Sequence, residues 1–134
     1  MDHARLQAAI AEYFAPWVQD LHLQVDAAGP STVTLRLPQD ARLSRVGGIL
    51  CGQAMMAAAD TAMALALMVH FGEFRPCTTV QMSSSFLRPL SAQDGLVQAT
   101  VLRAGKSLVF GEIDLRGAAD GKTVFRASTT YALV

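Results

Sequence analysis

One segment limits what this chain can fold into more than any other. From Gly47 to Phe71 it reads GGILCGQAMMAAADTAMALALMVHF, and no Lys or Arg occurs between Arg45 and Arg75. The apolar run starts after a pair of glycines and ends before another glycine, which predicts a helix over about residues 51–70. A helix that is apolar on almost every face must be surrounded by the rest of the protein.

The remaining sequence divides into one N-terminal helix and a series of strands. Helical spacing predicts one buried stripe in the opening helix, made of Leu6, Ala9, Ile10, Tyr13, Phe14 and Trp17. Short apolar runs, some alternating with polar residues, favour strands at 21–25, 32–38, 78–89, 96–104, 107–117 and 122–134. The turn DAAGPS separates the first two strands, and residues 38–48 are a polar loop.

This order of elements predicts an α+β fold in one domain, residues 1–134. A helix and two strands precede the long helix, and four strands follow it, the last three as a meander of hairpins. We expect one antiparallel sheet that curves around the 51–70 helix, because that helix needs cover on nearly every side.

The composition narrows the functional classes. Of 134 residues, 51% are hydrophobic and 16% are charged, and the formal net charge is zero. So much apolar sequence is enough for a sizeable core and leaves surface that an oligomer would cover. A neutral chain lacks the basic surface on which nucleic-acid binding depends, so we expect no nucleic-acid partner.

The cysteines and the N-terminus indicate a cytoplasmic protein. Cys51 and Cys77 cannot make a disulfide framework and are interpreted as reduced thiols. The N-terminal sequence MDHARLQAAIAEYF carries acids and no apolar signal region. The 49–71 segment is long enough to span a membrane, but Asp60 and Gln53 would be costly in lipid, so we expect no span.

Asp60 is the most informative residue of the apolar segment. Met56, Met63 and Ala64 share its helical face, and no local cation is available to pair with it. An ionisable group in an apolar site is a candidate general base, because burial and neighbours tune its pKa. The alternative is an aspartate that is merely tolerated or solvated on one exposed side of the helix.

The start of the same helix offers a second chemical group. The glycines in GGILCGQ permit close backbone approach, and the first N–H groups of a helix have no partner within it. Together with the positive end of the helix dipole, these groups suit an oxyanion or a polarised carbonyl. Taken alone, the motif is equally consistent with an ordinary glycine-rich helix entry.

The motif GGILCGQAMMAAADTA resembles the G-x-x-H-G-G-x-x-x-x-x-A-D pattern of hot-dog-fold acyl-CoA thioesterases of the PaaI-like, phenylacetate-degradation type. The matching positions are Gly48, Cys51 for the family's His, Gly52, Gln53 for its second Gly, and Asp60 for the catalytic acid. TTVQMSSSFLRP resembles the strand after the family's helix, and LRAGKSLVFGEIDLRGAADGKTVFRASTTYAL resembles its closing hairpins. The likeness covers about residues 32–133.

The resemblance implies a fold and a mechanism. The fold is a hot-dog, with a sheet of five or six antiparallel strands wrapped around the long central helix, and with an N-terminal helix. Such subunits pair as dimers or as dimers of dimers, with sites at the subunit interface. The reaction is hydrolysis of an acyl-CoA thioester, in which the Gly52 N–H polarises the carbonyl, Asp60 acts as general base or nucleophile, and Thr79 orients the water or Asp60.

The resemblance also implies contacts with the substrate. CoA contacts are expected from the loop, the helix start and the G-K-S turn, at Arg45, Cys51, Gln53, Arg88, Arg103, Gly105, Lys106 and Ser107. The acyl pocket is expected from Met56, Met63 and Met82, although such methionines are commonly core residues. CoA belongs to the substrate, and no metal or other cofactor is expected, because the three histidines show no ligand spacing.

Three other functions remain open. A non-catalytic module for acyl-CoA or acyl-carrier binding would keep the pocket without needing Asp60. A hot-dog hydroxyacyl-thioester dehydratase would use a loop histidine, and no His lies between His22 and His70. A purely structural dimerisation domain is the third.

Gly52 and Asp60 lie eight residues apart, about 12 Å along a helix. This distance predicts that Gly52 of one subunit faces Asp60 of the other.

Overall fold

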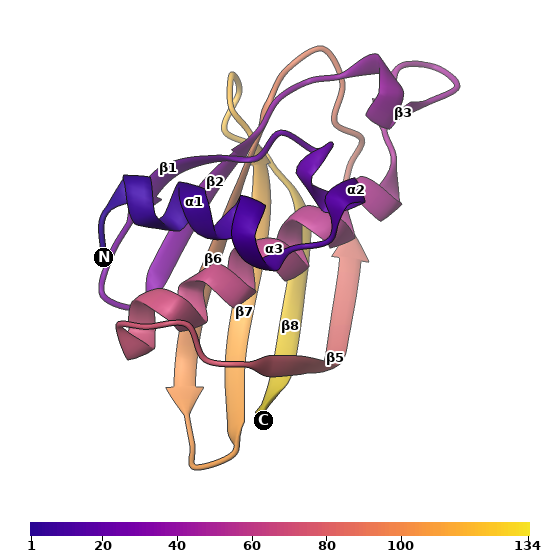
Figure 1. Ribbon diagram of the computed structural model, residues 1–134. Coiled ribbons are helices and arrows are strands. Elements are labelled where there is room, and N and C mark those ends of the chain that lie inside the picture. Colours follow the sequence, from indigo (N-terminus) through magenta and orange to yellow (C-terminus); the bar gives the residue numbers. More distant parts are fainter.

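A long helix lies against the concave face of a six-stranded antiparallel sheet (Figure 1). This computed structural model describes residues 1–134. The helices are α1 (His3–Tyr13), α2 (Pro16–Gln19), α3 (Gly52–Phe71) and the 3-10 turn η1 (Ala41–Leu43). The sheet runs in the order β1 (Gln24–Ala28), β2 (Thr32–Leu37), β6 (Gly95–Ala104), β7 (Leu108–Gly117), β8 (Thr123–Leu133) and β5 (Cys77–Phe86). The expected α+β hot-dog architecture and its six strands are confirmed.

Helix α3 forms the centre of the hydrophobic core. Eleven of its 20 residues are buried, and all of them except Thr61 belong to a cluster of 29 buried hydrophobic residues that also includes residues of α1, β2, β6, β7 and β8. The helix ends where Gly72 adopts a left-handed conformation, with φ 77°. By length and composition alone α3 could cross a membrane, but 61% of its most apolar 18-residue window is buried inside the protein. Its apolar character therefore matches its place in the core.

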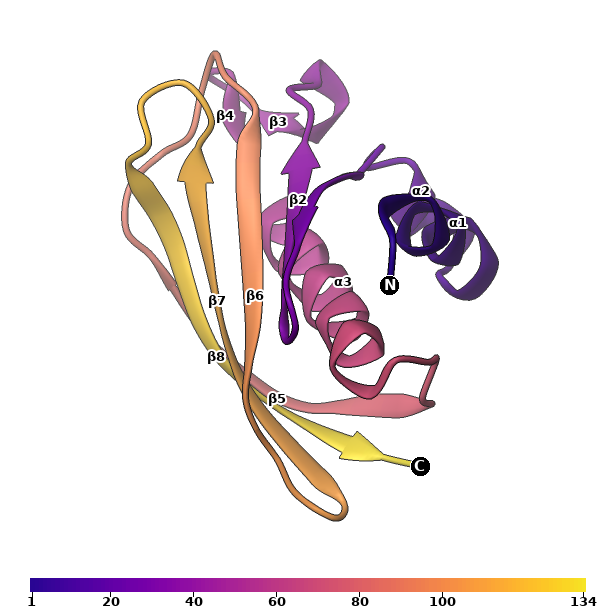
Figure 2. The same cartoon turned by 90° about the vertical axis from the view of Figure 1, so that its left-hand side faces the viewer.

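The sheet is built as the sequence predicted. Strands β6, β7 and β8 form the meander, with buried residues alternating along each strand. After α3 the chain returns along β5, which pairs with β8 on one side only. Figure 2 shows that the sheet curves around α3 and that α1 and α2 lie on the helix side, away from β7 and β8. Strand β5 is thus an exposed edge beside α3.

The predicted buried stripe of the opening helix is correct only as far as Ile10. Helix α1 ends at Tyr13 because Ala15 precedes Pro16 and is extended, and proline disfavours helical conformation in the residue before it. Leu6, Ala9 and Ile10 are buried as expected, whereas Tyr13 and Trp17 are exposed. Tyr13 stacks on Phe74 at 3.9 Å between ring centroids.

The first strand begins later than predicted. Leu21 and His22 are not in a strand, because their N–H groups donate to Val18 and Gln19 carbonyls in the turn that closes α2. Strand β1 instead continues through Ala28, and the predicted turn shrinks to Gly29, Pro30 and Ser31, closed by the Gly29 N–H on the Thr32 carbonyl.

The polar loop before α3 contains a small hairpin of its own. Strand β3 (Ser44–Arg45) pairs with β4 (Ile49–Leu50), and the chain reverses at Gly47 and Gly48, with φ 96° and 75°. Such positive φ values suit glycine, since a Cβ atom would be strained there. The Leu50 N–H donates to the Leu90 carbonyl, which fixes this hairpin near the end of β5.

Strand β7 approaches α3 closely at Gly111. A Cβ atom there would lie 2.3 Å from Met63 Cε and 3.0 Å from the Thr100 carbonyl oxygen. Because this part of the core is fully packed, we expect Gly111→Ala to lower the free energy of unfolding by about 1–3 kcal/mol. Urea denaturation measures it. Gly29→Ala is the control, since its Cβ meets only Thr32 Cβ at 3.8 Å, and equal stability of the two variants would contradict the expectation.

Candidate functional site

The antiparallel course of α3 and β5 brings two pairs of residues together. At the start of α3, a Cβ atom on Gly52 would lie 3.1 Å from Phe86 Cε1 at the end of β5. Two turns further along α3, Asp60 Oδ1 accepts a hydrogen bond of 2.8 Å from Thr79 Oγ1 near the start of β5. The strip between α3 and β5 therefore has an amide end at Gly52 and a carboxylate end at Asp60.

The Asp60 carboxylate is held by two hydroxyl groups. Its Oδ1 accepts hydrogen bonds from Thr79 Oγ1 and from the Tyr131 hydroxyl, which also lies 3.2 Å from the Asp60 carbonyl oxygen. Asp60 takes part in none of the three ion pairs of the chain, and Oδ2 has no hydrogen-bond partner within the chain. The predicted contact with Thr79 is present.

Of the two environments left open for Asp60, an apolar site or an exposed side of the helix, the single chain shows the exposed one. The Asp60 side chain is exposed, on the side of α3 that faces the edge strand β5. The sheet covers most of α3 but ends at β5, so residues on this side of the helix keep access to solvent. The carboxylate is thus fixed in direction by hydroxyl donors rather than isolated by burial.

The sequence reasoning missed Tyr131, which had been read only as part of the last strand. Its side chain is 2% exposed and projects from β8 toward α3. Tyr131 alternates along β8 with buried Thr129 and Ala127, which places it on the inward face. Because a buried phenol needs a hydrogen-bond partner, this alternation could have indicated a polar contact for Tyr131. Burial first, and then the negative charge of Asp60, raise the pKa of the Tyr131 hydroxyl, which keeps it a donor.

A pocket lies beside Gly52, the first residue of α3. The N–H groups of Gly52, Gln53 and Ala54 donate to no acceptor within the chain. The neighbouring open pocket, of about 530 Å³, joins apolar side chains to two arginines. Its lining is Arg45, Ile49, Leu50, Gly52, Met55, Phe86, Leu87, Arg88 and Pro89. Free amides and guanidinium groups together suit an anionic or strongly polar ligand.

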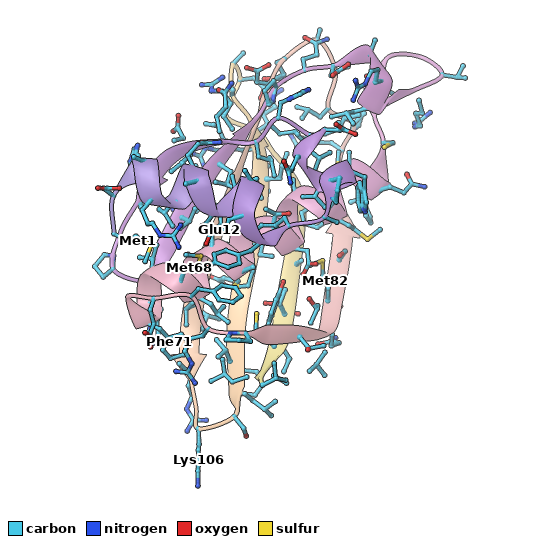
Figure 3. All side chains as sticks on the ribbon, viewed as in Figure 1. Met1, Glu12, Met68, Phe71, Met82 and Lys106 are labelled. Atoms are coloured by element: carbon cyan, nitrogen blue, oxygen red, sulfur yellow. The ribbon has the colours of Figure 1, made fainter.

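The predicted CoA-contact residues fall into two groups. Arg45 and Arg88 line the pocket, half-buried Cys51 is the N-cap residue of α3, and Gln53 is exposed beside it. Arg103, Gly105, Lys106 and Ser107 lie instead at the turn between β6 and β7, at the opposite end of the sheet. Lys106 points away from the body there (Figure 3). One chain alone does not bring these two groups together.

The three predicted acyl-pocket methionines have different environments. Met56 is exposed on α3, and half-buried Met82 lies between β5 and α3 (Figure 3). Met63 is fully buried in the core beside Gly111, so an acyl chain could reach it only by displacing core side chains. Met55, another methionine of α3, is buried and lines the pocket near Gly52.

Two further hydroxyl groups interrupt the apolar layer between the sheet and α3. Ser84 on β5 and Thr129 on β8 are inward-facing, and their oxygens are buried without a partner in the chain. They are diagonal neighbours, since Ser84 pairs with Ala127 and Thr129 with Met82. The layer beneath the strip from Gly52 to Asp60 is therefore unusually polar for a core.

No group of three or more His, Cys, Asp or Glu side chains gathers anywhere in the chain as a metal site would require.

Comparison with known proteins decides the family. The sequence model of the thioesterase superfamily matches residues 47–124, which is more than half of the chain. The protein belongs to the thioesterase superfamily. The matched region contains α3 and the strands β5, β6 and β7, and so includes Gly52, Asp60 and Thr79.

Solved structures share the fold of this thioesterase-superfamily protein. Thioesterase HI1161 from Haemophilus influenzae superposes with a TM-score of 0.89 at 21% identity, covering 100% of this chain and 91% of that one. The E. coli PaaI protein from the phenylacetic acid degradation operon gives 0.84 at 17% identity, over 98% of this chain and 93% of that one. The sequence is also 25% identical over 97 residues to a Thermoplasma acidophilum protein named "Putative esterase Ta0293", 72% of this chain and 73% of that protein. Together, family and fold support thioester hydrolysis.

The environment of Cys77 gives a test of the carboxylate's position. Burial first, and then the charge of Asp60, raise the pKa of the Cys77 thiol, so less reactive thiolate is present at any given pH. In a Cys51→Ser variant, we expect the pH midpoint for alkylation of Cys77 by iodoacetamide to lie above that of an ordinary thiol. Adding Asp60→Asn should lower the midpoint, because one of the two causes is removed. A midpoint that Asp60→Asn leaves unchanged would place the carboxylate away from Cys77.

Proposed function

We propose that this protein hydrolyses an acyl-CoA thioester to a carboxylate and free CoA. The observation that carries the proposal is Asp60, a carboxylate fixed through Oδ1 by two hydroxyl donors with Oδ2 free, on the helix whose first residue, Gly52, lines an arginine-bearing pocket. Membership of the thioesterase superfamily supports the reaction class. The acyl group is left open.

In this proposal the Gly52 N–H polarises the thioester carbonyl. The amide belongs to the first residue of a 20-residue helix, so the helix dipole adds to its partial positive charge. Preorganised N–H donors stabilise the negative oxygen that develops when the carbonyl carbon is attacked. Phe86 packs closely on Gly52, and a Cβ atom there would require the exposed Phe86 ring to shift slightly.

Asp60 supplies the second half of the chemistry. As a general base, it takes a proton from water while the water oxygen adds to the carbonyl carbon; the C–S bond then breaks and the proton passes to the CoA sulfur. As a nucleophile, Oδ2 would attack the carbon itself, expel CoA and form an anhydride that water hydrolyses. Both routes use the free oxygen Oδ2.

We propose that two copies of the chain form each site. Gly52 and Asp60 lie about 12 Å apart along α3, too far for both to reach one thioester group. Strand β5 is an unpaired edge whose end carries exposed Phe86 and Leu87, and such edges commonly pair with another chain. A two-fold axis between Met82 and Ser83 would put Phe86 of one copy beside Thr79 of the other. Because Gly52 packs on Phe86 and Asp60 bonds Thr79, this register joins Gly52 of one copy to Asp60 of the other.

The same pairing accounts for the separated groups of CoA contacts. An antiparallel β5 pairing reverses one copy, so its β6–β7 turn lies at the end of the joint sheet that carries Gly52 of the other copy. Arg45 and Arg88 of one copy, with Lys106 and Arg103 of its partner copy, would then face the phosphates of CoA. We further propose a cytoplasmic location, where acyl-CoA is available, and no cofactor beyond the substrate's own CoA.

Asp60→Asn tests the proposed reaction directly. Release of free thiol is measured with short, medium, long and aryl acyl-CoAs, and we expect turnover of at least one ester that falls 100-fold or more in the variant, the scale of losing an acid–base group. Asp26→Asn, an exposed aspartate on β1 without a side-chain partner, is the control and should keep wild-type turnover.

The other outcomes identify the rival functions. If no acyl-CoA is hydrolysed but acyl-CoA binds, the protein is a binding module. If wild type hydrates or dehydrates a hydroxyacyl thioester, it is a dehydratase. If Asp60→Asn retains full thioesterase turnover, the reaction stands but Asp60 does not perform it.

Gly52→Pro tests the amide while preserving the helix. Gly52 is the first helical residue, where proline is well tolerated, and Cys51 before it is extended with φ −70° and ψ 150°, as a residue before proline should be. Proline removes the N–H, so we expect kcat to fall about 10²–10³-fold. Gly52→Ala is the matched control, because it places a Cβ atom against Phe86 as proline does but keeps the N–H.

Mixing the two inactive variants tests the shared site. A hybrid of Asp60→Asn and Gly52→Pro subunits has one intact site if the two residues come from different copies. Equal mixing with subunit exchange should then restore about a quarter of wild-type activity. No recovery in a mixture that forms hybrids would contradict a site shared between copies.

A further inference from the structure

Tyr131 makes the most rigid contact with the Asp60 carboxylate. It belongs to β8, which is paired on both sides, and Tyr131 itself lies opposite Val109 of β7 and Thr79 of β5. Thr79 lies on the edge strand, next to a bulge between Thr79 and Gln81. The position of Thr79 thus depends on the edge, whereas the position of Tyr131 is set by the interior of the sheet.

The Tyr131 hydroxyl contacts both ends of the Asp60 residue. It lies within hydrogen-bond distance of the backbone carbonyl oxygen, at 3.2 Å, and of Oδ1 of the side chain. Because both acceptors belong to Asp60, one hydroxyl group ties the carboxylate to the backbone of α3 and to β8 at once. The ring is buried, so it cannot move away without opening the core.

We propose that Tyr131 is a positioning residue, which holds Oδ1 of Asp60 so that Oδ2 alone is presented to the substrate. This inference rests on the proposed thioesterase function and adds to it the group that sets the direction of the carboxylate. A carboxylate that rotates freely presents the reactive oxygen in the correct direction for only part of the time, and misplacement by a small distance lowers the rate strongly.

Two uncharged hydroxyl groups hold the Asp60 carboxylate, and no cation does. Thr79 and Tyr131 both donate to Oδ1, and neither carries a charge. Cys77 is the other titratable group near the carboxylate, and the chain's ion pairs do not involve Asp60. With no cation to fix it, the carboxylate depends for its direction on these two O–H groups, of which only Tyr131 comes from a strand that is paired on both sides within the chain itself.

Tyr131→Phe tests the proposal on the acyl-CoA that wild type hydrolyses. Phenylalanine keeps the buried ring and removes only the hydroxyl. We expect kcat to fall about 10- to 100-fold with KM within about threefold of wild type, because the interaction acts on the reacting group and not on binding. Tyr13→Phe removes the hydroxyl of the only other tyrosine, which lies on α1 and accepts a hydrogen bond from Arg5 rather than bonding Asp60, and it should leave both constants unchanged.

A purely structural role would give a different result. It would lower the melting temperature and the amount of active protein, and kcat per active site would stay within twofold of wild type, which would overturn the proposal. Turnover by wild type that Asp60→Asn abolishes, together with an unaffected Tyr131→Phe, refutes this inference and leaves the proposed function standing. Absence of any turnover by wild type refutes the proposed function instead.

A spectroscopic measurement keeps the proposal testable if Tyr131→Phe does not fold. In the Tyr13→Phe background, 3-fluorotyrosine labels position 131 alone. We expect its ¹⁹F resonance to move on Asp60→Asn and to stay in place on Asp26→Asn. A resonance that Asp60→Asn leaves unmoved would show that the hydroxyl does not bond the carboxylate, and would overturn the proposal.

Discussion

The burial of α3 is the constraint on which the rest of the structure depends. This helix is apolar on almost every face, and each face that water reaches costs free energy in proportion to its apolar area. A flat sheet covers one face of a helix, whereas a curved sheet covers several, and the six strands curve around α3 (Figure 2). Helix α1 adds Leu6, Ala9 and Ile10 to the same core. The curved sheet and α1 together bury most of α3.

The sheet leaves one side of α3 uncovered, and the proposed catalytic residues Gly52 and Asp60 lie on that side. The sheet ends at β5, so the side of α3 that carries Gly52, Met56 and Asp60 at four-residue spacing stays accessible. The same edge leaves backbone groups of β5 unpaired, with Phe86 and Leu87 exposed at its end. The proposed dimer would cover both the open helix face and the open strand edge. The proposed function and the proposed dimer therefore have the same physical origin.

The Asp60 carboxylate is directed without being neutralised. Ion pairing would fix its position and also reduce its ability to accept a proton, because a nearby cation favours the charged form. Hydroxyl donors from Thr79 and Tyr131 fix Oδ1 by geometry and leave Oδ2 unpaired. The partnerless oxygens of Ser84 and Thr129 extend this polar layer toward Gly52. This local departure from full hydrogen-bond satisfaction lies beside the residues of the proposed site.

The sequence by itself determined the elements and the local chemistry. Apolar periodicity predicted α3, the meander and the α+β class, and the acid in an apolar helix singled out Asp60, because these signals depend on residues close together in the chain. It could not predict the late start of β1 or decide the exposure of Asp60, since competing turn hydrogen bonds and the edge of the sheet decide those. Only the tertiary structure brought Tyr131, 71 residues away, onto Asp60, and only it separated Lys106 from Arg88. Such contacts arise from strand order and register, which are set by packing across the whole core rather than by any local pattern.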